Sequence, residues 1–499
     1  MVRTRSLAPV ADGPVVRSAR RRLRLPVACI LLGSPAIGIE AIARPVEGRR
    51  AASAQDESGR RPSRAARIRR AAAPSPEPNT AGGAAPAQDG QPLPRQYQVG
   101  EYGARPPQSA AQTGFSINER GVNLVSEDRT VKFRSGGRLH IDFNGVDPRR
   151  LPDSVGERVL IRRGRTDNYL NVRDQWLAAF QYDTANFVEP VFDAAVSYKG
   201  TSPFIVTVGQ IREPFSLQQM SSLNEEIFIE RAPVDALTPA WRFGGSVGAE
   251  VERWTGVAGV FGGSVNRGVE RDGIAVTART TYAPFLAGTD VLHLGAAGSY
   301  RAFDRNDRAT VFDSAAVNDA FGAAFITSRA VRGASSLTRL GAEAVLQLGP
   351  FRAQGEYIVN EVERDLLPAA APDRRPLRFD GAYVILSVPL NGPQRQYRLA
   401  PSYGTHFGIF GDMELPDEKR ISRGGIGVFE LAGRLAYLDL TEARDGGGFE
   451  RSWTAELAWR PEPNVKVKLD YSRFDVRRTL ANGGDLAVDV AEMRLQYYW

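Results

Sequence analysis

The sequence predicts an all-β protein, a transmembrane antiparallel β-barrel over residues 115–499 with a disordered N-terminal segment. Three observations predict this fold. Segments of about ten residues with alternating apolar and polar side chains recur after residue 114, and this length suits a tilted strand that crosses a bilayer. Glycine is abundant at 50 residues. Mean hydropathy is −0.29, which excludes a helical membrane protein.

Residues 1–43 are expected to form a signal peptide. A basic cluster at 17–24 precedes an apolar run at 25–39, which is too short to span a bilayer well, and small residues follow. This order is typical of a secretory signal. Cleavage is expected after Ala43, or alternatively after Ala54. A buried helix of a cytoplasmic protein is the alternative interpretation.

The only cysteine, Cys29, lies inside the apolar run, so the exported chain would have no disulfide and no zinc–thiolate site. Residues 44–114 are rich in Ala, Pro and Arg and predict a disordered linker. Their cluster at 60–70 could bind nucleic acid or anionic lipid, but we favour a solvated linker and expect no nucleic-acid partner.

The net charge of +7 does not describe the predicted barrel. Residues 1–114 hold 18 Lys and Arg against 8 Asp and Glu, out of totals of 64 and 57. This leaves 46 basic and 49 acidic residues for the barrel, a net charge of −3. Any preference for anions must therefore come from where the charges lie.

The strand prediction rests on alternation with a period of two. Leu139, Ile141 and Phe143 alternate with polar residues from Arg138 to Asn144. The same pattern is found over residues 192–199, 274–282, 339–348, 351–360 and 465–472. A soluble sandwich also alternates, but residues 115–499 show no domain boundary, and only a closed barrel leaves no unpaired edge in lipid.

The chain ends with "EMRLQYYW", which predicts a last strand with an apolar outer face up to the terminus. We expect this strand to direct membrane insertion and to pair with the first strand of the barrel. Its apolar face would consist of Met493, Leu495, Tyr497 and Trp499.

Five stretches of the predicted barrel carry distinctive motifs. They are "VGQIREPFSL" (208–217), "SSLNEEIFIERA" (221–232), "GAYVILSVPLNGPQRQYR" (381–398), "GVFELAGRLAYLDL" (427–440) and the closing "RLQYYW". Together they resemble the phosphate-selective porin O and P family of outer-membrane proteins, and the matches occur in the family's order between about residue 121 and the end of the chain. One departure is Pro389, which replaces part of an aromatic-rich run and is expected at a strand end. The resemblance implies sixteen strands, usually a trimer with one pore per subunit, and a long loop folded into the lumen.

A pore selects solutes by the side chains that line it, and Arg and Lys attract anions. The alternative is that each cation solvates a polar lumen or pairs with an acidic neighbour such as Glu225, Glu226 or Glu230. Arg212 and Arg231 flank the "EPF" and "ER" motifs, close to the expected constriction. The full set of expected pore-lining cations is Lys132, Arg134, Arg138, Lys199, Arg212, Arg231, Arg279, Arg339, Arg352, Arg434, Lys466 and Lys468.

The sequence therefore predicts a passive outer-membrane porin for small hydrophilic solutes, with a preference for anions such as phosphate or polyphosphate. No enzyme activity, cofactor or metal is expected. Expected partners are outer-membrane lipid, the outer-membrane assembly machinery, small anions and two further copies in a homotrimer. The alternatives are a general or cation-preferring porin, a secreted β-sheet binding protein, and an outer-membrane hydrolase that uses Ser402 and His406.

Overall fold

A computed structural model describes most of the chain after residue 112. The signal peptide and nearly all of the linker predicted from the sequence lie outside the described residues. The described ranges are 113–119, 121–146, 158–268, 272–304, 309–314, 324–365, 375–400, 404–443, 446–478 and 483–499.

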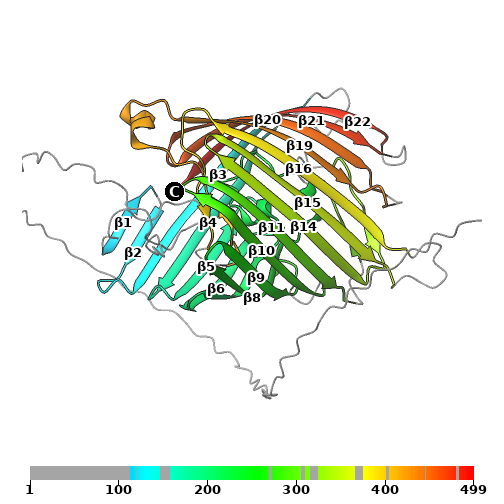
Figure 1. The fold of residues 1–499 in the computed structure, drawn as a ribbon, viewed down its shortest axis with the longest axis horizontal. Helices are drawn as coiled ribbons and strands as arrows, with labels where there is room; N and C mark the ends of the chain where they lie inside the picture. The colour runs from blue at the N-terminus through cyan, green and yellow to red at the C-terminus, as the bar shows by residue number, and fades with distance from the viewer. Residues whose placement is uncertain are drawn as a thin grey trace, which may run out of the picture. The chain divides into compact units, whose positions relative to one another are not determined.

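Sixteen antiparallel strands form a closed barrel (Figure 1), which confirms the predicted fold. Each strand pairs with the next in chain order, and β22 pairs with β3 to close the wall. Pro389 is the last residue of its strand. The strands are β3 (Val131–Val146), β4 (Arg158–Val172), β5 (Trp176–Asp183), β6 (Val191–Thr201), β7 (Phe204–Arg212), β8 (Trp241–Val251), β9 (Trp254–Phe261), β10 (Ile274–Ala287), β11 (Asp290–Ala302), β14 (Ser336–Leu348), β15 (Phe351–Glu363), β16 (Leu377–Pro389), β19 (Val428–Asp439), β20 (Phe449–Glu462), β21 (Val465–Arg477) and β22 (Leu486–Tyr498).

The two ends of the barrel differ in the length of their connections. At one end of the barrel, here called the turn end, most strands are joined by tight turns, such as residues 202–203 and 349–350. At the other end, here called the loop end, the connections are longer, as in residues 213–240 and 303–335. Short turns face the periplasm and long loops face the outside in barrels of this class. The exception at the turn end is the long segment 390–427.

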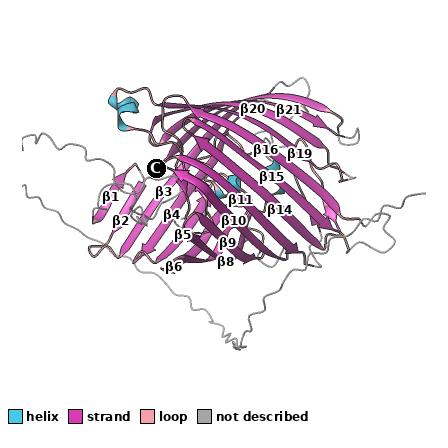
Figure 2. Ribbon diagram, viewed as in Figure 1, coloured by secondary structure: helices cyan, strands magenta, loops and turns pink. Residues whose placement is uncertain are grey.

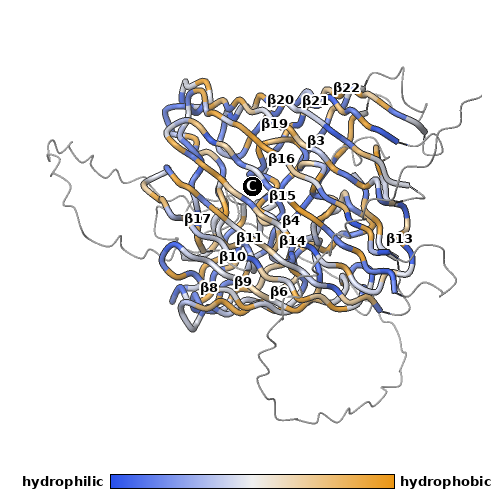
Figure 3. The backbone as a smooth tube through the Cα atoms, turned by 45° about the vertical axis from the view of Figure 1, so that its right-hand side comes forward, coloured by the Kyte–Doolittle hydropathy of each residue, from blue (hydrophilic) through white to orange (hydrophobic). Residues whose placement is uncertain are grey.

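The alternation read from the sequence is also present in the wall, as the alternating colours along the strands show (Figure 3). Val276, Leu340 and Leu469 face outward and are 46–56% exposed. Arg279 and Lys468, on the opposite face of β10 and β21, are buried. Apolar side chains on the outside and polar ones on the inside are typical of a barrel in lipid.

Strand β3 has two successive partners along one edge. Its second half pairs with β22, from Arg138 opposite Tyr498 to Val146 opposite Val490. Its first half pairs with β2 (Gly121–Val125), which forms a hairpin with β1 (Gly114–Asn118). The backbone of Trp499 bonds to Gly137 between the two partners. The hairpin therefore continues the wall beyond the end of β22.

The polarity of the wall is reversed near the loop end of β14 to β22. There the inward residues are apolar, including Phe379, Leu438 and Phe474, and they pack with Phe312 and Phe325 from the connection 303–335. The outward residues are charged, as in the Arg451–Asp475 pair at 3.1 Å. Charged outward side chains indicate that this rim stands above the hydrocarbon, because charges on the lipid face are costly.

Among the described residues, helical structure is limited to short turns (Figure 2), namely α1 (Leu217–Met220), η2 (Pro233–Leu237), η3 (Asp417–Lys419) and η4 (Ile421–Arg423). None of the helices in the described ranges is long and apolar enough to cross a membrane. Two small antiparallel pairs complete the described elements: β12 (Ala309–Thr310) with β13 (Val331–Arg332), and β17 (Tyr397–Arg398) with β18 (Ile409–Phe410).

Candidate functional site

Residues 213–240, here called the loop insert, leave β7 and fold into the barrel. The Glu356 carboxylate on β15 accepts the backbone N–H groups of Leu217 and Gln218 at 3.0 and 2.8 Å. Further along, the Leu237 carbonyl accepts bonds from inward side chains of β14 and β15. These contacts with inward-facing side chains place both helical turns of the loop insert inside the lumen.

The middle of the loop insert is held by the wall at β19 and β21. Lys466 and Lys468 on β21 donate to the carbonyls of Asn224 and Glu226 at 2.8 and 3.1 Å. Arg434 on β19 donates to the Glu230 carbonyl at 2.8 Å. The loop insert therefore reaches from β14 and β15 to β21, and narrows the lumen between them.

Glu230 is the most strongly paired carboxylate of the loop insert. Arg162, Arg163 and Arg494 donate to it at 3.0, 3.5 and 2.7 Å. Burial disfavours its ionisation, but the three guanidinium groups hold the pKa of Glu230 well below its usual value. This cluster joins the loop insert to β4 and β22.

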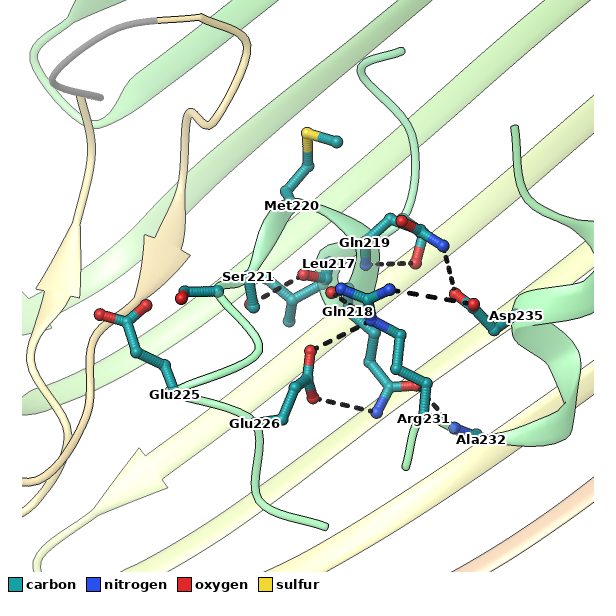
Figure 4. Close-up of polar contacts among 12 residues, drawn as sticks. Leu217, Gln218, Gln219, Met220, Ser221, Glu225, Glu226, Arg231, Ala232 and Asp235 are labelled. Carbon is teal, nitrogen blue, oxygen red and sulfur yellow. Dashed lines mark hydrogen bonds and ion pairs between the residues drawn. The ribbon is translucent and has the colours of Figure 1, made fainter. Parts of the chain in front are cut away.

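Polar contacts within the loop insert fix its own shape (Figure 4). Arg231 donates to the Gln218 carbonyl at 3.1 Å and to the Glu226 carboxylate at 3.4 Å. Gln219 donates to Asp235 at 2.7 Å. Burial raises the pKa of both Glu226 and Asp235, and Arg231 opposes this shift in each case.

Residues 390–427, here called the turn insert, leave β16 at the turn end. Their described residues between 395 and 413 enter the lumen and meet the loop insert, whereas η3 and η4 have no buried residues. Arg395 donates to the Glu225 carbonyl at 2.5 Å. Arg398 pairs with the Glu225 carboxylate at 3.3 Å. His406 Nδ1 donates to the Met220 carbonyl at 2.8 Å. The lumen is thus occupied by two segments that contact each other.

The turn insert is also bound to the wall by its own charged side chains. Asp412 pairs with Lys466 at 2.5 Å and with Arg460 at 3.2 Å, and Arg395 lies 3.6 Å away. Burial disfavours the Asp412 carboxylate, but these cations hold its pKa well below the usual value. Arg395 also pairs with Glu430 on β19 at 2.6 Å.

A second attachment joins the turn insert to β10, β11 and β14. Arg279 pairs with Glu343 at 2.5 Å and donates to the Gly408 carbonyl at 3.1 Å. The Tyr397 hydroxyl bonds to His293 Nδ1 at 2.8 Å, and His293 Nε2 bonds to Glu343 at 2.9 Å. The chain of hydrogen bonds from Tyr397 to Arg279 fixes the small β17–β18 pair against the wall.

The structure brings together some of the cations expected from the sequence. Arg231, Arg339, Arg434, Lys466 and Lys468 all contact the loop insert. Four others also lie in the lumen or on its wall. Arg138 pairs with Asp167 at 2.5 Å, and Arg279 binds the turn insert. Arg212 donates to the Ser221 carbonyl at 2.9 Å, and Arg352 lies 3.8 Å from the centre of the Phe410 ring.

Three of the expected cations lie apart from this group, near the turn end of the barrel. Lys132 pairs with Asp174 at 2.8 Å and is partly exposed. Arg134 lies 5.0 Å from the centre of the Tyr169 ring. Lys199 is near the end of β6, where its backbone N–H donates to the Gln175 carbonyl.

Sequence reasoning missed several cations that hold the inserts. Arg494 lies on the polar face of an alternating strand, so the alternation could have identified it. Arg162 and Arg163 lie at a register shift between β3 and β4, where the alternation is interrupted. Arg395 lies in a segment with no alternation, and no signal in the sequence marked it as lumenal.

The hydrolase alternative receives no support at its proposed pair. Ser402 lies outside the described residues, and the His406 Nδ1 atom is engaged by the Met220 carbonyl. The apolar outer face, the polar lumen and the two inserts define an outer-membrane channel protein. Residues 133–499 match the family described as phosphate-selective porin O and P, so the chain belongs to that family.

Two relatives are similar over most of their length. A protein of Caulobacter vibrioides described as uncharacterised is 28% identical over 410 residues, or 78% of each chain. Porin O of Pseudomonas aeruginosa is 25% identical over 415 residues, which cover 76% of this chain and 90% of that protein. Among solved structures, the outer membrane protein OmpT of Vibrio cholerae aligns with 74% of this chain and 100% of its own at 10% identity, with a TM-score of 0.45.

Proposed function

We propose that this protein is a passive porin that admits small hydrophilic solutes and prefers anions such as phosphate or polyphosphate. Membership of a family described as phosphate-selective supports the anion preference, as does the similarity to Porin O. The concentration gradient supplies the driving force, so no cofactor takes part. We further propose an exported precursor, outer-membrane assembly by the cell's own machinery, and a homotrimer.

The observation that carries the anion preference is a set of inward arginines with neutral partners. Arg339 donates to the Leu237 carbonyl at 3.2 Å, Arg352 to the side chains of Gln347 and Gln354, and Arg434 to the Glu230 carbonyl. Within the described ranges, none of the three has a carboxylate oxygen at ion-pair distance.

Each of these guanidinium groups also keeps one buried N–H without a hydrogen-bond partner among the described residues: Arg339 Nη1, Arg352 Nε and Arg434 Nε. A cation with no carboxylate at ion-pair distance contributes a positive potential to the lumen, and this potential raises the local concentration of anions. The three arginines lie near the loop end, near the turn end and between them, so the potential extends along the pathway.

A general or cation-preferring porin is the second candidate, because the lumen also holds acids with an unpaired oxygen. Glu456 Oε1 and Glu450 Oε2 are buried with neither a hydrogen-bond nor an ion-pair partner in the described part of the chain. The barrel region is also slightly acidic overall. Permeability measurements decide between the two candidates.

The test is the reversal potential of the purified protein in a planar bilayer under a KCl gradient, followed by titration with phosphate. We expect a reversal potential whose sign shows that chloride is more permeant than potassium. We also expect that a low concentration of added phosphate reduces the KCl conductance. A cation-selective channel, or one indifferent to phosphate, would reject the substrate preference and leave the porin class intact. No channel from heat-modifiable, folded protein would reject the porin function itself.

A further inference from the structure

Three carboxylates lie side by side on the inner wall beneath the loop insert. In the strand register, Glu456 on β20 is directly opposite Asp470 on β21, and Asp470 is directly opposite Glu492 on β22. Neighbouring strands are about 4.8 Å apart, so these side chains are immediate neighbours. They are 1, 5 and 7% exposed. We call Glu456, Asp470 and Glu492 the acidic row.

The protein supplies fewer donors than the acidic row can accept. Lys468 lies 3.1 Å from Glu456, and Asp470 accepts the Ile229 N–H at 2.9 Å. Within the described residues, three of the six carboxylate oxygens, Glu456 Oε1, Asp470 Oδ1 and Glu492 Oε1, are buried with neither a hydrogen-bond nor an ion-pair partner. Asn144 on β3, opposite Glu492 and 4% exposed, has neither amide atom bonded. In the described residues, the four unpaired oxygens around this space therefore outnumber its one unpaired donor group, the Asn144 NH2 group.

Protons fit this space better than a metal ion does. In the described part of the chain, no group of three or more His, Cys, Asp or Glu side chains is arranged to hold a metal. Glu456 and Asp470 are direct cross-strand neighbours, so their carboxyl groups can come within hydrogen-bonding distance of each other. Two carboxyl groups can bond in this way only if one of them carries a proton. Adjacent like charges in a desolvated site also do not all ionise together.

We propose that the acidic row is a proton-controlled selectivity element of the pore. At acidic pH the row shares protons, and the cations around it are left to attract anions. As pH rises the row ionises, offsets those cations, and weakens the preference for anions. This inference rests on the proposed porin function, and it adds residues that set the selectivity together with the condition under which they act.

The row lies where its charge can act on the constriction. Lys468 and Arg434 hold carbonyls of the loop insert directly above it. The 3.1 Å between Lys468 and Glu456 is much shorter than the screening length of about 8–10 Å at physiological salt. Salt therefore does not screen the charge of the row from this cation. Charged groups lie near the row on its neighbouring elements: Arg434 and Glu430 on β19, Lys468 on β21, Arg494 on β22, Asp142 on β3, and Glu226 and Glu230 of the loop insert. The arginines stay charged throughout, so the row supplies the change.

The experiment measures the anion-to-cation permeability ratio of the full chain in a planar bilayer from about pH 5 to about pH 9, a range over which closely spaced buried carboxyl groups can lose a shared proton. We expect the wild-type ratio to fall severalfold as pH rises. Glu492→Gln and Glu456→Gln should each keep a higher ratio at alkaline pH and a flatter profile. Glu361→Gln, a change at an exposed outward residue of β15, should follow the wild type.

Heat-modifiable migration first verifies that each variant is folded. A wild-type profile that does not depend on pH, or two folded row variants with the wild-type slope, would overturn the proposal.

A second measurement does not require conduction. The infrared spectrum of the wild type at neutral pH should contain a protonated carboxyl band that loses intensity in Glu456→Gln and Glu492→Gln. If this band is present but the folded protein shows no channel conductance, the porin function alone is rejected. If the band is absent, the acidic row is rejected as a proton store.

Discussion

The two inserts occupy the same lumen but are held in opposite ways. The loop insert is held mainly through its backbone, because wall side chains such as Lys466, Lys468 and Arg434 donate to its carbonyls. The turn insert is held mainly through its own side chains, above all Arg395 and Asp412. The anchoring of the loop insert therefore depends mainly on side chains of the wall. The anchoring of the turn insert depends mainly on its own side chains.

This difference predicts where substitutions are tolerated. A carbonyl is present whatever the side chain, so most positions of the loop insert can change without losing their anchors. In the turn insert, one substitution can leave several buried charges without a partner, and an unpaired buried charge is costly. The turn insert should therefore be the more easily displaced of the two.

The largest effect is expected from Asp412→Asn. The change removes the counter-charge of Lys466 and Arg460 while keeping the size of the side chain. Breaking a buried ion pair costs about 3–5 kcal/mol. We expect a lower denaturant midpoint in detergent and a higher single-channel conductance, because the turn insert leaves the lumen.

Asp417→Asn is the matched control, since Asp417 lies in the same insert but is half exposed. It should leave the midpoint and the conductance close to those of the wild type. Equal effects of the two substitutions would contradict the assignment of Asp412 as the main anchor.

Glu230→Gln should have the next largest effect and should depend on pH. Glu230 is the one side chain of the loop insert that binds three wall arginines, so it is an exception to backbone anchoring. The pKa of Glu230 is lowered in the folded state. Its stabilisation is therefore present above the unfolded value of about 4.3 and is lost as pH falls through the lower folded value.

We expect the variant to lose about 2–3 kcal/mol at neutral pH. The difference from the wild type should shrink as unfolding is measured at pH values progressively below about 4. A difference that stays constant over this range would show that the Glu230 charge does not stabilise the loop insert.

The wall was predictable from the sequence to a much greater extent than the inserts. Alternation identified β3, β10 and β21 and the outward direction of residues such as Leu469, because lipid on one side and a polar lumen on the other impose a period of two. The reversed rim was not foreseen. Phe379 and Phe474 continue the alternation there, but the solvents on the two faces have changed, and period alone does not say which face is which.

The position of the turn insert was not predictable for a different reason. Its anchors pair residues far apart in the chain, as Arg395 does with Glu225 and Glu430, and no local pattern encodes such pairs. Pairing with acidic residues was left open as an alternative for each expected cation. The structure shows such pairs for Arg138, Arg279 and Lys466, but not for Arg339.

A smaller effect is expected where the turn insert packs on the wall at Gly248 of β8. A Cβ atom at this position would overlap the ring of Phe407. Gly248→Val should push Phe407 away and cost about 1–3 kcal/mol through overpacking. Gly256→Val, at a position with open space around it, is the control. Denaturant midpoints of the two folded variants should differ, and equal midpoints would mean that Phe407 does not pack tightly at this point.

The smallest change in stability, but a clear change in selectivity, is expected from Arg339→Gln. The arginine contacts only a carbonyl of the loop insert among the described residues, and glutamine can still donate a hydrogen bond. The loop insert should therefore keep its place, while the lumen loses one positive charge that no carboxylate offsets. We expect the anion-to-cation permeability ratio to fall roughly twofold, with the denaturant midpoint nearly unchanged.

Arg451→Gln is the control. It removes an equally charged residue from the outer rim, where Asp475 pairs with it and water screens it, and it should leave the permeability ratio unaltered. If both variants lowered the ratio equally, selectivity would depend on net charge, and the neutral partners of the lumenal arginines would have no special part in it.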